Sequence, residues 1–338
     1  MIKVEDVRIN YGDFVALDNI NFNVNKGEFF TLLGPSGSGK STMLRAIAGF
    51  IEPSAGTISI DGRVVNNTPV EDRGIGMVFQ SYALFPSMSV YNNIAFGLNV
   101  EGADKQYIKE RVNELARMVD LSDDQLKKNV SELSGGQQQR VAITRALAKK
   151  PELLAMDEPL SNLDARLRKS LRQELKNIQH ELGVTTLYVT HDQEEALTLS
   201  NRIAVFSDGR LEQVGTPQEI YSHPASEFVC SFIGDSNKLS SDIIKLIAPE
   251  QIKKERSNVF YVRPENIKLR PHSDDHQSNE IVCTFKNKDY YGTHYVYHIL
   301  HEPTNTAIDV QENVNHDNEF VEGEEVIVSF DIQKIHAF

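Results

Sequence analysis

Short runs of alternating apolar and polar residues fill the first 65 positions of the chain. Runs of this kind indicate strands, and they lie at residues 2–9, 14–24, 28–33 and 57–62. Residues 40–50 carry apolar side chains at helical spacing, and this pattern stops at Gly49. We therefore expect the chain to begin with several strands and one short helix.

From about residue 86 to residue 151 the apolar spacing becomes helical. Ile108, Val112, Leu115 and Val119 recur at spacings of four, three and four residues, which places them on one face of a helix. A second stripe consists of Leu163, Leu167, Leu171, Leu175, Ile178 and Leu182. We interpret both stripes as amphipathic helices that pack into a hydrophobic core.

Further apolar runs at residues 152–159, 183–191 and 202–211 predict three more strands, and the last two flank a helical segment at 194–200. Strands that alternate with helices imply a mainly parallel sheet. The first part of the chain is therefore predicted to be an α/β domain.

After Gly234 the pattern changes to short strands with polar turns. They are predicted at residues 260–270, 281–286, 290–300, 306–311 and 325–332, with a loop at 271–279. This favours a small, barrel-like all-β domain. With the boundary near 235–240, we expect an α/β domain at residues 1–235, a helical subdomain at about 86–151, and a β-domain at 236–338.

The composition limits where the protein works and what it binds. The chain has 338 residues, enough for two domains, and 40% of them are hydrophobic. It has neither an apolar run of about 18 residues nor a signal-peptide pattern at its start, so we expect a cytoplasmic protein. Its two cysteines are far apart, which favours free thiols. The net charge of −13 makes nucleic acid a poor candidate partner.

Residues 34–41 read GPSGSGKS, follow an apolar strand and begin a helix, the context of a phosphate-binding loop. Its glycines let backbone N–H groups and the helix N-terminus surround phosphates. Lys40 would reach the β- and γ-phosphates, and the Ser41 hydroxyl would hold Mg²⁺. We expect nucleotide contacts from Gly34, Pro35, Ser36, Gly37, Ser38, Gly39, Lys40, Ser41 and Thr42. The motif alone indicates a P-loop NTPase, which includes kinases, GTPases and helicases.

Two carboxylates follow the apolar run at 153–156 and would lie at the carboxyl end of a buried strand, where sheet ligands bind. Asp157 would support Mg²⁺, and Glu158 would face the γ-phosphate and polarise the attacking water. An acidic pair after a strand occurs in many folds, so it does not identify the class of enzyme.

The segment LSGGQQQR at 133–140 narrows the class, because Ser134 and two glycines begin a second helix that could bind phosphate. This segment resembles the signature of ABC ATPases, which other P-loop enzymes lack. The resemblance implies a fold with a RecA-like core, an antiparallel β-subdomain and a helical subdomain. It also implies two copies packed head to tail, with Ser134, Gly135, Gly136 and Gln137 completing the nucleotide site of the other copy.

Other motifs follow in the order of the same family. The resemblance implies that Tyr11 stacks on adenine, and that Gln80 contacts Mg²⁺ or water. It also implies that Asp164 lies at the dimer seam and that His191 contacts the γ-phosphate. The similarity covers residues 1 to about 235 and implies ATP and Mg²⁺ as cofactors, with Glu158 and His191 as the catalytic groups.

Two segments are similar to importer ATPases. Residues Gln80–Val90 resemble the surface that docks transmembrane permease subunits, with Tyr82, Leu84, Phe85 and Met88 as candidate contacts. Residues 219–239 resemble the join to an OB/TOBE-like domain, more like the polyamine, ferric-iron and aminoethylphosphonate importers than the sugar importers. The resemblance implies a peripheral protein at the cytoplasmic face of the membrane, in a complex that includes an extracytoplasmic solute-binding protein.

Two other functions remain open at this stage. A soluble ABC ATPase acting on nucleic acid or ribosomes usually has two cassettes or a long insertion, which this chain lacks. A regulatory protein with a vestigial ATPase is disfavoured by intact Glu158 and His191. His294 and His298 would share one face of a strand, and we favour a packed or solvated face over a metal site.

Overall fold

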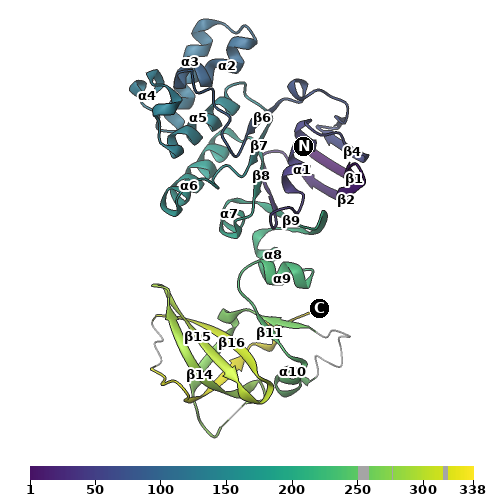
Figure 1. Cartoon of the computed structure of the whole chain (residues 1–338), viewed down its shortest axis with the longest axis vertical. Coiled ribbons are helices and arrows are strands. Elements are labelled where there is room, and N and C mark those ends of the chain that lie inside the picture. The colour runs from purple at the N-terminus through teal and green to yellow at the C-terminus, as the bar shows by residue number, and fades with distance from the viewer. Residues whose placement is uncertain (250–258, 276, 315–318) are drawn as a thin grey trace. The chain divides into compact units, whose positions relative to one another are not determined.

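The structure is a computed structural model that describes residues 1–249, 259–275, 277–314 and 319–338. Contacts between residues divide the chain into two compact units, Met1–Ile220 and Tyr221–Phe338 (Figure 1). The loop predicted at 271–279 includes residue 276, which lies outside the described residues.

A six-stranded sheet with the order β10-β9-β3-β8-β7-β6 forms the centre of the first unit. Its strands are β3 (Phe29–Leu33), β6 (Ile75–Val78), β7 (Leu153–Asp157), β8 (Thr185–Thr190), β9 (Arg202–Ser207) and β10 (Arg210–Gly215). All neighbouring strands in this order except β10 and β9 pair in parallel, which confirms the predicted mainly parallel sheet. Every residue of β3, β7 and β8 is buried, as expected for strands covered on both faces.

The predicted single strand at residues 202–211 is wrong, because β9 and β10 are two strands of an antiparallel hairpin. The chain turns at Asp208 and Gly209, which have φ values of 45° and 74°. Two consecutive residues with positive φ give the tight turn that connects neighbouring antiparallel strands.

A second sheet in the first unit is antiparallel, with the order β2-β1-β4-β5. Its strands are β1 (Ile2–Tyr11), β2 (Phe14–Val24), β4 (Ala55–Ile60) and β5 (Arg63–Val64). This sheet confirms the strands predicted near the start of the chain. Its buried side chains share one core with the α1 side of the parallel sheet.

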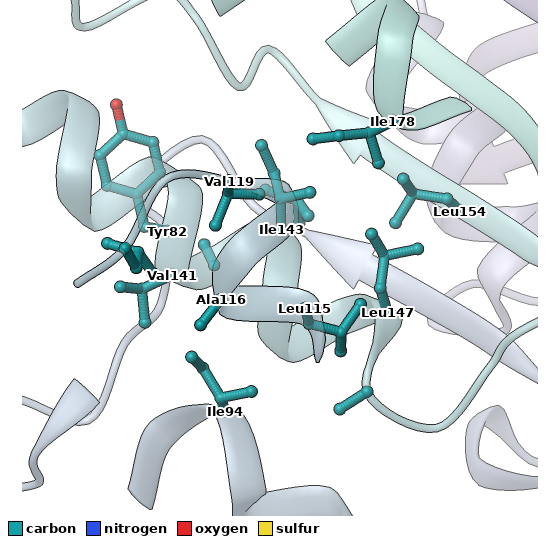
Figure 2. Close-up of a cluster of buried hydrophobic side chains, with 14 of the residues drawn as sticks. Tyr82, Ile94, Leu115, Ala116, Val119, Val141, Ile143, Leu147, Leu154 and Ile178 are labelled. Carbon is teal, nitrogen blue, oxygen red and sulfur yellow. The ribbon is translucent and has the colours of Figure 1, made fainter. Parts of the chain in front are cut away.

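The helices of the first unit are α1 (Lys40–Ala48), α2 (Val90–Val100), α3 (Lys105–Met118), α4 (Asp123–Lys127), α5 (Gly135–Leu147), α6 (Ala165–Leu182), α7 (Gln193–Leu199) and, at its end, α8 (Pro217–Ser222). Helices α2 to α5 lie within the predicted helical subdomain. Figure 2 shows Leu115, Ile143 and Ile178 from α3, α5 and α6 in one apolar cluster. None of the helices among the described residues combines the length and apolar character needed to cross a membrane.

The second unit contains two antiparallel sheets, with the orders β11-β12-β18 and β13-β17-β14-β15-β16. Their strands are β11 (Asn237–Leu239), β12 (Phe260–Val262), β13 (Ile267–Pro271), β14 (Glu280–Tyr290), β15 (His294–His301), β16 (Thr306–Asn313), β17 (Glu325–Phe330) and β18 (His336–Ala337). Cys230 and Cys283 are buried and free, as predicted.

Short 3₁₀ turns occur in both units. Those of the first unit are at Val70–Asp72 and Val130–Glu132, and those of the second are at Pro264–Asn266, Glu302–Thr304 and Ile332–Lys334.

The strands of the second unit agree with the predicted β-domain at 236–338, and one short helix lies inside those bounds and another just before them. These helices are α10 (Ser241–Ile247) and α9 (Glu227–Phe232), respectively. Ile243, Ile244 and Ile247 of α10 are buried in the same core as the strands. A helix of this length spans about two turns, too few to give a distinct helical period in the sequence.

The division between the units falls after Ile220, before the predicted boundary near 235–240, and Arg263 contributes contacts on the C-terminal side of it. This buried side chain donates hydrogen bonds to the Tyr221, Cys230 and Asp235 carbonyl oxygens and to the Ser236 hydroxyl, at 2.7–3.3 Å. These bonds attach the segment containing α9 to the strands of the second unit.

Candidate functional site

The loop between β3 and α1 requires glycine at two positions for steric reasons. A Cβ atom on Gly34 would lie 2.3 Å from the Phe206 carbonyl oxygen. Gly39 has a φ of 99°, and a Cβ atom there would lie 2.4 Å from Leu17 Cδ2. Because glycine has no Cβ atom, the loop can pack closely against Phe206 and Leu17.

A cavity of about 410 Å³ lies over this loop. It is lined by Tyr11, Phe14, Ala16, Ser36, Gly37, Gly39, Lys40, Ser41, Thr42, Gln80 and Glu158. All but Phe14 and Ala16 were predicted from the sequence. Phe14 is 68% exposed and begins β2 opposite Tyr11, so its signal would have been a second aromatic residue directly after the turn that follows Tyr11. The other predicted loop residues, Gly34, Pro35 and Ser38, support the loop and do not line the cavity.

Lys40 is only 4% exposed, although it carries an ammonium group. Its Nζ atom donates to the Pro35 carbonyl oxygen at 2.8 Å and lies 3.5 Å from Ser38 Oγ. Burial lowers the pKa of Lys40, and the negative charges of Glu158 and Asp157 offset part of this effect. A buried cation at the start of a helix creates a site that favours an anion.

Ser41 and Asp157 meet at the end of β7, as predicted. The Ser41 hydroxyl donates to Asp157 Oδ1 at 2.6 Å. The guanidinium of Arg45 lies 3.5 Å from Asp157 Oδ2. Sequence reasoning missed Arg45, although it lies four residues after Ser41 and therefore on the same face of α1. The serine and aspartate oxygens are the type of donor that a hard divalent cation prefers.

Glu158, Gln80 and His191 form a second group beside the first. Glu158 Oε2 lies 3.2 Å from His191 Nδ1 and 3.5 Å from Gln80 Nε2. Glu158 has a φ of 46°, and its N–H donates to the Val189 carbonyl oxygen at 3.0 Å. Left-handed backbone is costly for a residue other than glycine and is concentrated at functional sites. Here it accompanies the turn of the chain at the end of β7.

None of residues 134–137 is among the described residues that line this cavity. Ser134 precedes α5, where its N–H donates to Gln137 Oε1 at 3.0 Å. A Cβ atom on Gly136 would lie 2.8 Å from the Leu167 side chain, so glycine lets α5 approach α6. Gly135 also lies at this contact, where its Cβ would lie 3.4 Å from Leu163 Cδ2.

Asp164 is the N-cap of α6, since its Oδ1 accepts a hydrogen bond from the Leu167 N–H at 2.9 Å. It does not line the cavity. Within one copy the structure therefore joins the loop, the two acidic residues, Gln80 and His191, but leaves the 134–137 segment and Asp164 outside this group.

The prediction that Tyr82 is a surface contact is wrong. Tyr82 is 7% exposed and belongs to the apolar cluster of the helical subdomain, where Figure 2 labels it. Leu84 also packs against this cluster, and Phe85 and Met88 are partly exposed. Arg145 explains the inward turn, because its guanidinium donates to the Tyr82 and Ala83 carbonyl oxygens at 3.0 and 2.8 Å.

His294 and His298, the two histidines predicted to share a strand face, have partners within their own unit. His298 lies between Asp309 and Asp289, with nitrogen–oxygen distances of 2.7 and 3.1 Å. His294 stacks on Tyr291, with ring centroids 5.1 Å apart. Within the described parts of the chain, no three His, Cys, Asp or Glu side chains are grouped in a way that could hold a metal ion.

Comparison with known families and proteins agrees with this geometry. The model of the ABC transporter family matches residues 17–161, and that of the TOBE domain matches residues 260–338. A spermidine/putrescine import ATP-binding protein PotA from Acetivibrio thermocellus is 41% identical over 99% of this chain and 96% of its own length. The chain belongs to the ABC transporter ATP-binding family. Proteins with the same name from Mannheimia succiniciproducens and Ruegeria pomeroyi are 40% and 44% identical, over 94% and 93% of this chain and 90% and 89% of their own lengths.

Solved ABC cassettes are similar to this chain. A bacterial ABC transporter cassette in dimeric form is 35% identical and has a TM-score of 0.58, over 64% of this chain and 99% of its own. A cassette from Clostridium perfringens, part of the complex cbiONQ, is 29% identical with a TM-score of 0.62, over 75% and 98% of the two chains. These comparisons confirm the predicted importer-type ABC ATPase with a TOBE-like domain, and they do not favour the alternative acting on nucleic acid.

Proposed function

We propose that this ABC ATPase binds ATP with Mg²⁺ over the loop at 34–41 and hydrolyses it to drive import of a polyamine. The observation that carries the proposal is that Ser41 and Glu158 line one cavity, where the Ser41 hydroxyl bonds Asp157 and the Glu158 carboxylate lies beside His191. In support, the dimeric cassette described above was also solved in a post-hydrolysis state with ADP and phosphate bound, and this structure is 34% identical to this chain.

Each group has a separate task in this proposal. Backbone N–H groups of the loop and the Lys40 ammonium would bind the phosphates, while Tyr11 and Phe14 offer aromatic faces to the base. Ser41 and Asp157 would hold Mg²⁺, with Gln80 close to it, and the bound ion would neutralise charge on the phosphates. Glu158 would orient and polarise the attacking water, and His191 would contact the γ-phosphate.

We infer that a second copy completes each site. The helix start at Ser134, with Gly135, Gly136 and Gln137, lies away from the cavity of its own chain, so its phosphate-binding N–H groups are available to another copy. Asp164 would lie at the same seam. The dimeric cassette that matches this chain supports such a pair.

The relatives supply the argument for the cargo. Those named above are spermidine/putrescine import proteins and align along nearly the whole chain, including the second unit. We therefore favour a polyamine over ferric iron or an aminoethylphosphonate. In this proposal the subunit acts at the cytoplasmic face of the membrane with permease subunits, which dock near Phe85 and Met88, and with an extracytoplasmic solute-binding protein.

The first experiment measures the mass of the Glu158→Gln variant by light scattering, with and without MgATP. A slow-hydrolysing variant should retain the nucleotide and shift from monomer to dimer. Adding Ser134→Arg to this variant should abolish the shift without abolishing ATP binding, because the arginine would occupy the phosphate-binding helix start. If the dimer formed equally well with Ser134→Arg, the proposed completion of the site by the second copy would be wrong.

The cargo is tested in membranes that contain the permease subunits, the binding protein and this chain. Spermidine or putrescine at the outer face should raise ATP hydrolysis, whereas ferric iron and aminoethylphosphonate should not. The His191→Ala variant in the same membranes is the matched control and should remove the stimulated rate. Stimulation by ferric iron alone would overturn the assignment to polyamines.

A further inference from the structure

Arg168, in the first turn of α6, connects two loops that carry proposed site residues. Its NH2 atom donates to the Leu163 carbonyl oxygen at 3.2 Å, and its NH1 atom donates to Asp192 Oδ2 at 3.0 Å. We propose that Arg168 is a positioning residue that couples the 161–164 loop to the placement of His191. This inference rests on the proposed contact of His191 with the γ-phosphate.

The 161–164 loop is in direct contact with the other site residues of its own chain. Ser161 Oγ donates to the Glu158 carbonyl oxygen at 2.9 Å and accepts from Gln80 Nε2 at 3.2 Å. Asn162 Nδ2 donates to the Gln80 carbonyl oxygen at 3.0 Å. A displacement of this loop would therefore be felt at both Gln80 and Glu158.

His191 lies between two residues whose positions are fixed by a buried network. The Asp192 N–H donates to Thr190 Oγ1 at 3.0 Å, and Thr190 Oγ1 donates to Glu195 Oε2 at 2.7 Å. The Tyr188 hydroxyl donates to the same carboxylate oxygen at 2.8 Å. Glu195 is 3% exposed, and its N–H donates back to Asp192 Oδ1 at 3.1 Å. The network therefore fixes the backbone on both sides of His191.

Arg168 joins this network to the 161–164 loop. Within the network it donates a hydrogen bond to Asp192, and its Nε lies 4.0 Å from Glu195 Oε1, at the limit of an ion pair. The planar guanidinium can bond two acceptors at once in a fixed geometry, which the single ammonium of lysine cannot reproduce. Contact with a second copy that moves residues 161–164 would thus reach the backbone beside His191 through Arg168 and Asp192. This is in addition to the route through Ser161 and Glu158, whose Oε2 lies 3.2 Å from His191 Nδ1.

The test compares steady-state MgATP hydrolysis by the full-length protein and its Arg168→Met variant. The kcat should fall about tenfold, because a misplacement of about 1 Å can cost about 10²-fold and we expect a smaller displacement of His191 here. The KM for ATP should stay within about twofold, since Arg168 does not line the cavity. Arg168→Lys should not restore kcat, although it keeps the charge.

Arg172→Met is the matched control. Arg172 lies one turn further along α6 and bonds a carboxylate of α7, with NH2 donating to Glu194 Oε1 at 2.8 Å. Its side chain is more buried than that of Arg168, so its loss should lower thermal stability at least as much. Among the described residues, however, this hydrogen bond leads to α7 and not to the 161–164 loop, so kcat should be unchanged.

Equal losses of kcat in the Arg168→Met and Arg172→Met variants, or full rescue by Arg168→Lys, would overturn the coupling role and leave a structural one. His191→Ala is assayed in parallel to separate this result from the proposed function. If His191→Ala is inactive while Arg168→Met retains full kcat, only the inference about Arg168 fails. If His191→Ala retains full kcat, the proposed role of His191 fails.

Discussion

Lys40 in the first unit and Arg263 in the second are both buried cations, with exposures of 4% and 1%, but their surroundings differ. Lys40 makes one short bond, to the Pro35 carbonyl oxygen, and faces a cavity. Arg263 donates to four oxygen atoms of its own unit and lies over the Tyr221 ring, 4.3 Å from its centroid.

This difference separates a ligand-binding cation from a structural one. A buried charge is costly unless it is paired and hydrogen-bonded. The fold supplies acceptors to both terminal nitrogens of Arg263, whereas Lys40 retains donors beside a cavity, where an incoming phosphate can satisfy them. Burial of a charge therefore indicates function only when the fold leaves part of its hydrogen-bonding capacity unused beside a cavity.

The largest expected effect comes from Lys40→Met. Removing one preorganised contact to the transferred phosphate should lower kcat/KM for MgATP by about 10² to 10³. The free energy of unfolding without nucleotide should not fall, because the substitution also removes a poorly compensated buried charge. Hydrolysis assays and urea titrations measure the two quantities. A large loss of stability would contradict the comparison.

Arg263→Met should show the opposite pattern. Four oxygen acceptors would lose their donor in the interior, which we expect to destabilise the second unit by about 3 kcal/mol. Hydrogen exchange of the full chain should show faster exchange in the peptides that contain α9 and β12, with ATP affinity unchanged. Arg270→Met in the same unit is the control and should cost less, because Arg270 is partly exposed. Equal losses in the two variants would contradict the structural role.

The sequence predicted the parts of the site that are contiguous in the chain. Residues 34–41 and the Asp157–Glu158 pair are recognisable because strand, loop and charge lie next to each other. The parallel sheet was predictable for the same reason, since each strand and helix has its own period.

The remaining features depend on contacts between distant residues. Burial of Tyr82 depends on Arg145 in α5, and the place of Arg263 depends on carbonyl oxygens about 30 to 40 positions earlier in the chain. The link between Arg168 and Asp192 is likewise visible only in the folded chain. Alternating polarity could not separate β9 from β10, because a turn of two residues interrupts it only briefly.

Glu280 should make the second unit sensitive to acid. Hydrogen bonds from Arg270, the Gln277 N–H and Ser329 lower the pKa of Glu280 to about 2. Since its folded pKa lies below the unfolded value of about 4.3, its contribution is complete above that value and is lost as the pH falls towards 2. The advantage of the wild type over Glu280→Gln in urea unfolding should shrink between pH 4.5 and pH 2.5. An advantage that did not change with pH would argue against a role for the ionised carboxylate.

His298 should give the smallest effect, with the opposite sign. Burial lowers the pKa of His298, but hydrogen bonds and charges from Asp309 and Asp289 outweigh this and raise it. The resulting stability, under about 1 kcal/mol for a pair that is partly exposed, is present below pH 6.5 and lost as the pH rises through the folded pKa. The advantage of the wild type over His298→Gln in urea unfolding should therefore be larger at pH 6 than at pH 9. His301, on the same strand, is the control. Burial lowers the pKa of His301, so the advantage of the wild type over His301→Gln should be smaller at pH 6 than at pH 9. If both differences changed with pH in the same direction, the carboxylates beside His298 would not be what sets its charge.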